Sequence, residues 1–172
     1  MNRTGAPNSS PNFLTIGRRG DNSSALHFNG LIDEVRIWNI ARSATDLVNA
    51  MNAPLAGNEA NLVAYYNFNQ SGQGTGLSLT NSSTSPQSGG TAVQGTTQGN
   101  ASTPAFRTTA AALDFDGIND FVQVNHNAMS TSPLSLEAWV KPALRTDGTA
   151  YTNFPNNVIS SDLPGGYGHG FG

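Results

Sequence analysis

Oxygen-bearing side chains cluster in one short segment of the chain. In "DFDGIND", the residues Asp114, Asp116, Asn119 and Asp120 fall within seven positions. Carboxylate and amide oxygens are the hard ligands that Ca²⁺ prefers, so these four residues are candidate calcium ligands. Their spacing is not that of an EF-hand loop, and the closing Glu is missing. The alternative is a hairpin turn at Asp116 and Gly117, with Asn119 and Asp120 accepting hydrogen bonds from backbone N–H groups.

Paired carboxylates of the kind used in glycoside hydrolysis do not occur at a suitable spacing. A retaining glycosidase holds two carboxyl groups about 5–5.5 Å apart, one as nucleophile and one as acid. Asp33 and Glu34 are adjacent, so in a regular strand they point to opposite faces, and Glu137 is alone in its segment. The absence of Cys also excludes disulfides and Cys-ligated zinc. The sequence therefore predicts no catalytic residues, and no enzyme.

Two tryptophans lie on strand faces that could bind a sugar. In "LSLEAWVKP" (134–142) alternate residues are apolar, and Trp139 lies on the opposite face. Trp38 lies opposite the aliphatic row of "GLIDEVRIW" (30–38). Exposed aromatic rings can stack on the apolar face of a pyranose, so Trp38 and Trp139 are candidate ligand-binding residues. A second layer of structure packed over the sheet is the alternative explanation for both.

The position of Asp33 raises a question about the same strand. Counting in twos places its carboxylate in the middle of the aliphatic row of residues 31–37. Burying a charge without partners costs several kcal/mol. Two interpretations follow. Either the Asp33 carboxylate accepts hydrogen bonds from backbone N–H groups or from Arg36 or Arg42, or a bulge after Ile32 resets the alternation and turns Asp33 outward.

The composition favours short strands joined by turns. Charged residues make up 11% of the 172 residues and hydrophobic residues 37%, with 19 Gly. The net charge is −3 and the basic residues are scattered, which argues against a nucleic-acid partner. The longest apolar run is too short to span a membrane, so we expect no membrane insertion. Residues 1–12 lack the features of a signal peptide, so either the protein is cytosolic or this chain is an interior piece of a longer one.

The expected elements are mostly strands. They cover 13–17, then 25–39 with a turn at Asn29 and Gly30, then 61–70, 111–125 with an Asp-Gly turn, 134–142 and 157–161. The segment 71–109 is rich in Gly, Ser, Thr and Asn, with "LSLT" and "GTAV" as short candidate strands. One helix is expected near 43–51, because Ser43 and Asp46 form a capping box. These elements predict an all-β, antiparallel sandwich or jelly roll.

Three stretches together resemble a known domain type. "ALDFDGINDFVQV" followed by "LSLEAWVKP" resembles the opening half of a LamG-like jelly-roll domain of the concanavalin A-like lectin/glucanase superfamily. "LTIG" and "FNGLIDEVRIWNIARSATDL" resemble its closing half, and "LVAYYNFNQ" resembles a segment that joins such domains. The resemblance covers about residues 13–70 and 111–161. It implies a concanavalin A-like jelly-roll sandwich, and in such domains a Ca²⁺ ion often binds at a loop rim.

The closing half precedes the opening half, and the middle strands of the family are missing. We therefore expect an incomplete fold, with residues 1–57 as the C-terminal part of one domain and 58–110 as a linking segment. Residues 111–172 would be the N-terminal part of a second domain, so that the chain crosses a junction between tandem repeats. The alternative is a permuted single domain, in which both halves complete one sandwich.

The resemblance implies a non-catalytic role. We expect a carbohydrate- or protein-binding, or adhesion, module of a large secreted or cell-surface bacterial protein, located outside the cell. Glycans or other extracellular proteins would be its ligands, and neighbouring repeats of a longer chain its other partners. Two alternatives are an accessory domain of an extracellular polysaccharide-degrading enzyme, whose catalytic part lies outside this chain, and a structural spacer.

Overall fold

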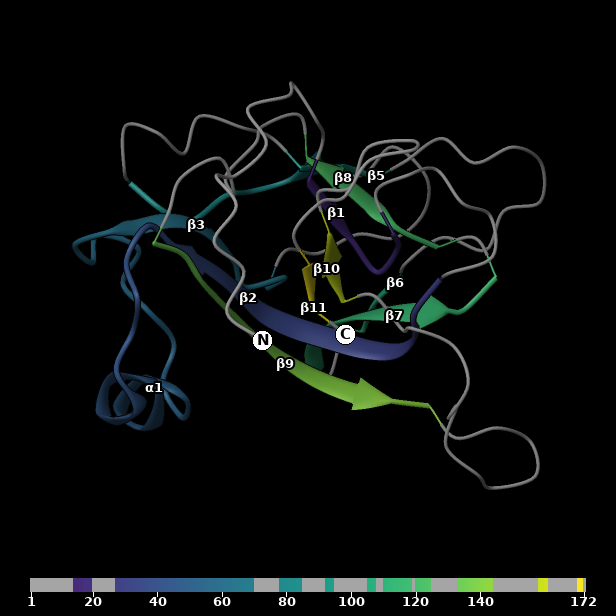
Figure 1. Ribbon diagram of the computed structural model, residues 1–172. Helices are drawn as coiled ribbons and strands as arrows, with labels where there is room; N and C mark the ends of the chain where they lie inside the picture. The colour runs from purple at the N-terminus through teal and green to yellow at the C-terminus, as the bar shows by residue number, and fades with distance from the viewer. Residues whose placement is uncertain are drawn as a thin grey trace.

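The computed structural model of the chain shows two antiparallel β-sheets and a short helix (Figure 1). It describes residues 14–19, 27–69, 78–84, 92–94, 105–107, 110–118, 120–124, 133–143, 158–160 and 170–171. The helix α1 spans Ala44–Ala50. The strands are β1 (Leu14–Ile16), β2 (Asn29–Trp38), β3 (Leu62–Tyr66), β4 (Ser78–Leu79), β5 (Ala92–Gln94), β6 (Ala105–Arg107), β7 (Ala110–Asp116), β8 (Val122–Val124), β9 (Ser135–Pro142), β10 (Ile159–Ser160) and β11 (Gly170–Phe171).

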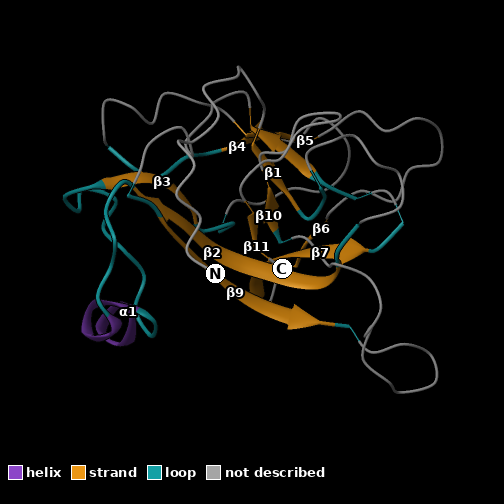
Figure 2. Ribbon diagram, in the orientation of Figure 1, coloured by secondary structure: helices purple, strands orange, loops and turns teal. Residues whose placement is uncertain are grey.

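The two sheets pack face to face. Among the described residues, one sheet has the strand order β11-β10-β1-β8-β5-β4. The other has the order β3-β2-β7-β6, with β9 also paired to β2. Figure 2 shows the sheet of β2 and β9 below the sheet of β1 and β8. The predicted fold class, mainly antiparallel β-structure with one short helix, is confirmed.

An apolar core lies between the sheets. Strands β1, β8 and β10 contribute aliphatic side chains from one sheet, and β2, β3 and β7 contribute aliphatic and aromatic side chains from the other. The residues that share this core include Leu14, Ile16, Val122, Val124 and Ile159 on the first sheet, and Ile32, Val35, Ile37, Tyr66, Leu113 and Phe115 on the second. β-branched and aromatic residues favour strands because they cover a pleated, half-buried surface well.

In both sheets, strands from distant parts of the sequence are hydrogen-bonded neighbours. β2 pairs with β9 from Gly30–Pro142 to Trp38–Ser135, and also with β7 and β3. β1 lies between β8 and β10. The predicted segments 1–57, 58–110 and 111–172 thus all supply strands to one sandwich. That the first and third segments derive from successive modules of a longer protein stays a prediction.

A β-bulge in β2 answers the question about its alternation. Between the pairs Asp33–Trp139 and Arg36–Glu137, two residues of β2 lie opposite one residue of β9. The extra residue is Glu34, which has a positive φ of 50°. Ile32 therefore faces the core before the bulge, and Val35 faces it afterwards. A bulge was one of the two interpretations of the sequence, but it lies at Glu34 rather than directly after Ile32.

The helix begins as its capping box predicts. The Ser43 hydroxyl accepts a hydrogen bond from the Asp46 backbone N–H, and the Asp46 carboxylate accepts one from the Ser43 N–H. The turn expected at Asn29 and Gly30 is wrong, because both residues belong to β2 and pair with β7. Gly30 has a φ of +134°, a conformation that glycine adopts readily, and β2 continues its pairing with β7 through this residue.

Candidate functional site

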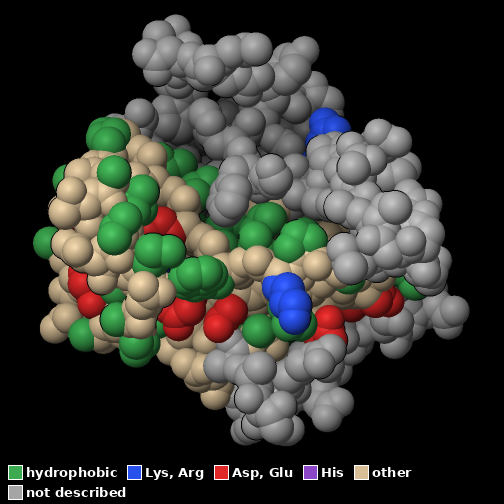
Figure 3. All heavy atoms as spheres, turned by 90° about the horizontal axis from the view of Figure 1, so that it is seen from below, with side chains coloured by type: hydrophobic (Ala, Val, Ile, Leu, Met, Phe, Trp, Pro, Cys, Tyr) green, Lys and Arg blue, Asp and Glu red, His purple; other side chains and the backbone are tan. Residues whose placement is uncertain are grey.

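The outer face of the sheet, away from the core, carries polar cross-strand pairs. Because of the bulge, Asp33 lies opposite Trp139, and Arg36 lies opposite Glu137. Residues directly opposite each other on one face of an antiparallel pair have side chains in contact range. Figure 3 views the molecule from the side on which β9 and α1 lie, and acidic side chains are spread across this face on both sides of a basic side chain. The sheet therefore brings charged groups from both ends of the chain together.

A cavity of about 370 Å³ opens on this face. Its walls come from three places: β2, the loop that follows α1, and β9. The lining residues are Asp33, Glu34, Arg36, Met51, Asn52, Ala53, Pro54 and Trp139. The cavity therefore combines carboxylates, a guanidinium, an amide and an indole ring in one concave surface, a more polar lining than that of most small-molecule sites.

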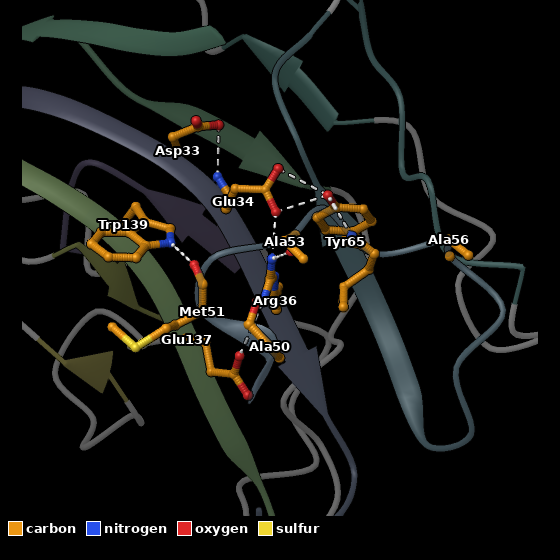
Figure 4. Close-up of polar contacts among 12 residues, drawn as sticks. Asp33, Glu34, Arg36, Ala50, Met51, Ala53, Ala56, Tyr65, Glu137 and Trp139 are labelled. Atoms are coloured by element: carbon orange, nitrogen blue, oxygen red, sulfur yellow. Dashed lines mark hydrogen bonds and ion pairs between the residues drawn. The ribbon is translucent and has the colours of Figure 1, made fainter. Parts of the chain in front are cut away.

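Arg36 holds the loop after α1 over the sheet. Its side chain is 3% exposed. Nη1 donates a hydrogen bond to the Ala50 carbonyl at 2.8 Å, and Nη2 donates to the Ala53 carbonyl at 2.8 Å and to Glu34 Oε2 at 2.6 Å (Figure 4). Nη1 also lies 3.7 Å from Glu137 Oε2. Among the described residues Nε has no hydrogen-bond partner, so the bonds of Nη1 and Nη2 are those that hold the loop on the sheet.

Tyr65 completes the network from β3. Its hydroxyl donates to the Glu34 carboxylate, 2.8 Å from Oε2 and 2.9 Å from Oε1, and accepts a hydrogen bond from the Leu55 N–H at 3.3 Å. Burial, and then the hydrogen bond to Glu34, raises the pKa of Tyr65 to about 12. Glu34 is therefore held by Arg36 and Tyr65, and these contacts stabilise a backbone conformation that costs a non-glycine residue about 1–2 kcal/mol.

The two candidate tryptophans have different environments. Trp38 is 1% exposed and packs with Leu62 and Tyr65, and the Arg42 guanidinium lies 4.0 Å from its ring centroid. Other parts of the chain pack over Trp38, as the alternative explanation expected, and its buried ring cannot be reached by a ligand in this structure. Trp139 is 46% exposed, and its Nε1–H donates to the Met51 carbonyl at 2.8 Å. That bond fixes one edge of the indole beside the cavity.

Asp33 lies on the outer face beside Trp139. Its Oδ1 accepts a hydrogen bond from the Glu34 N–H at 2.7 Å, so a backbone donor holds the carboxylate, as one interpretation of the sequence expected. Arg36 was a candidate partner, but its ion pair is with Glu34, and Arg42 pairs with Glu137 at 3.3 Å. Burial raises the pKa of Asp33 to about 6 against the effect of the Glu34 hydrogen bond.

The carboxylates of the candidate calcium segment bind the backbone. Asp116 Oδ1 accepts a hydrogen bond from the Ile118 N–H at 2.8 Å, and Asp120 Oδ2 accepts one from the Asp116 N–H at 3.0 Å. These bonds are those of a hairpin turn, with Gly117 at a φ of +77°. Burial raises the pKa of Asp120 to about 6, and the charges of Asp116 and Asp114 add to this increase.

A metal site does not follow from these carboxylates alone. Asn119 lies outside the described residues, and within the described ranges no three His, Cys, Asp or Glu side chains are placed to hold a metal ion. Asp114, Asp116 and Asp120 do not form such a group by themselves. Calcium binding stays a prediction. No helix among the described residues is long and apolar enough to cross a membrane.

Sequence reasoning missed the loop that forms the cavity. The sequence predicts only a helix end at Met51 and no element for Asn52, Ala53 and Pro54, yet these four residues supply one wall of the cavity. Their contacts to the sheet use backbone carbonyls, which leave no signal in a sequence pattern. Glu34 and Arg36, two residues apart in a strand, gave a signal for a polar site, because in a regular strand their side chains share a face.

A comparison with family models identifies the first part of the chain. Residues 2–48 match the family described as the concanavalin A-like lectin/glucanases superfamily. No curated protein and no solved structure matches the chain. The match covers β1, β2 and most of α1, and the resemblance suggested for residues 111–161 stays a prediction. Residues 2–48 are therefore similar to a LamG-like domain of the concanavalin A-like lectin/glucanases superfamily.

Proposed function

We propose that the chain is a non-catalytic carbohydrate-binding module of a secreted or cell-surface bacterial protein, with glycans as its ligands. The observation that carries this proposal is the half-exposed ring of Trp139 beside a cavity lined by Asp33, Glu34 and Asn52. The ring offers an apolar platform for a pyranose, and the side-chain oxygens beside it can accept hydrogen bonds from sugar hydroxyls.

A binding role fits the carboxylates better than a catalytic one. Glycoside hydrolysis needs two carboxyl groups that are free to act as acid and nucleophile. Glu34 is already engaged by Arg36 and Tyr65, and Glu137 lies 3.3 Å from Arg42 Nε. Asp33 is left without a second free carboxylate among the residues that line the cavity.

Replacing Trp139 with alanine is expected to weaken glycan binding at least tenfold, because aromatic anchors of an interface commonly carry more than 1.4 kcal/mol. The wild-type chain is first screened on a glycan array, and the strongest ligand is then titrated by calorimetry. Val48→Ala serves as the matched control, because Val48 is 62% exposed on α1 and does not line the cavity. Equal binding by both variants, or no glycan bound by the wild-type chain, would contradict the proposal.

A further inference from the structure

The ion pairs around the cavity leave one carboxylate without a basic partner. Three carboxylates, of Asp33, Glu34 and Glu137, lie on this part of the outer face together with two guanidinium groups and the ammonium of Lys141. Arg36 pairs with Glu34 at 2.6 Å, and lies 3.7 Å from Glu137. Arg42 also pairs with Glu137. Within the described ranges, no basic side chain forms an ion pair with Asp33.

The Asp33 carboxylate, which has no ion pair among the described residues, lies opposite an aromatic ring. Asp33 and Trp139 are direct cross-strand partners, and the bond from Trp139 Nε1 to Met51 holds the indole beside the cavity. An aromatic face attracts a cation within about 6 Å of its centroid. A carboxylate forms its strongest hydrogen bonds with a charged donor. A ring and an unpaired carboxylate on one wall are together suited to a protonated amine.

We propose that the cavity binds the protonated amino group of an amino sugar, between the Asp33 carboxylate and the Trp139 ring. This inference rests on the proposed function and specifies its ligand class. Neutral sugars would gain the stacking on Trp139 but would leave the Asp33 charge uncompensated. Acidic sugars would be repelled by the Asp33 carboxylate, which has no cation of its own among the described residues.

Binding should weaken in acid. A bound ammonium favours the ionised form of Asp33 and so lowers its pKa from the value of about 6 in the free protein. Below that value, binding must first remove a proton, so affinity falls as the pH falls. Other charged groups near Asp33 are Glu34 and Arg36 on β2, Glu137 and Lys141 on β9, and Asp114 on β7, which lies opposite Leu31. The loop residues 51–54 carry no titratable side chain.

The test compares two hexasaccharides of equal length, one of β-1,4-linked glucosamine and one of its N-acetylated form. Binding is measured by calorimetry to the whole chain at pH 7 and pH 5. We expect the glucosamine hexasaccharide to bind about tenfold more tightly at pH 7, and several-fold less tightly at pH 5 than at pH 7. Asp33→Asn should remove the preference, because asparagine keeps the acceptor for the Glu34 N–H and loses the charge.

Asp46→Asn is the control for net charge. Asp46 lies on α1, outside the cavity, and its removal subtracts the same unit charge. The inference would be overturned if Asp33→Asn still bound the glucosamine hexasaccharide more tightly than the N-acetylated one. It would also be overturned if Asp46→Asn lost this preference to the same extent as Asp33→Asn, because both results would show non-specific attraction of a polycation. Equal binding of the two hexasaccharides, abolished in Trp139→Ala, would overturn the amino-sugar inference and leave the proposed function standing. Failure of every glycan on the array to bind would overturn both.

Discussion

Replacing Arg36 with methionine is expected to lower the free energy of unfolding by about 3–5 kcal/mol, because breaking a buried ion pair leaves its partner charge uncompensated. Methionine fills much of the same volume but donates no hydrogen bond. The Glu34 carboxylate loses its cation, and the carbonyls of Ala50 and Ala53 lose the donors that hold the loop on the sheet. The variant should therefore also lose the cavity.

Urea unfolding at pH 7.5 measures this change. Arg42→Met is the matched control, since Arg42 is more exposed, at 16% against 3% for Arg36. Arg42 is partly buried and its pair with Glu137 is longer, at 3.3 Å, so Arg42→Met should lose clearly less stability than Arg36→Met. Adding Glu34→Gln to Arg36→Met should restore part of the lost stability, because it removes the unpaired charge. Equal losses in the Arg36 and Arg42 variants would show that Arg36 is not the buried anchor of the loop.

Replacing Gly30 with alanine is expected to lower the free energy of unfolding by about 3 kcal/mol, from backbone strain and from overpacking. A Cβ at this position would lie 2.3 Å from the Lys141 carbonyl oxygen and 2.7 Å from the Ala143 nitrogen. Both are backbone atoms of β9 or the residue after it, so no side chain can turn away. The φ of +134° adds strain for any residue with a Cβ.

Thermal unfolding followed by circular dichroism measures the Gly30 effect. For a domain of this size, 1 kcal/mol corresponds to about 2–4 °C in Tm, so Gly30→Ala should lose about 6–12 °C. Leu31→Ala is the neighbouring control. Leu31 faces outward and is only partly buried, so its truncation should cost clearly less. If Gly30→Ala has the same Tm as the wild-type chain, β2 and β9 do not approach each other closely at this point.

Local features of the fold could be predicted from the sequence. The capping box of Ser43 and Asp46 depends on four consecutive residues. The alternation of residues 134–142 places Leu134, Leu136 and Ala138 against the core as expected, whereas Val140, on the same face, is 39% exposed. The hairpin turn at Asp116 likewise depends on its own side chain and the following glycine. These signals are contained within a few residues, so a single sequence carries them in full.

The site depends on features that a single sequence does not encode locally. The bulge at Glu34 is set by the register of β2 against β9, about 100 residues away in the chain. Periodicity identifies a strand but not its partner, so neither the Asp33–Trp139 pair nor the cavity could be derived from it. Trp38 and Trp139 looked alike in sequence, and the loop after α1 covers one and leaves the other half-exposed.

The pairing of β2 with β9 brings Asp33 and Trp139 to one cavity, and a cross-link measures it most directly. Leu31 and Lys141 are direct partners on the outer face, and the chain has no Cys of its own. Directly opposed residues have a geometry that a disulfide can bridge. Under mild oxidation, Leu31→Cys with Lys141→Cys should form an intramolecular disulfide, seen as faster migration on a non-reducing gel and as a linked peptide by mass spectrometry. Leu31→Cys with Val140→Cys, which places the thiols on opposite faces, should not. Failure of the first pair to cross-link within one chain, or equal cross-linking of both pairs, would contradict the shared sandwich and the site built on it.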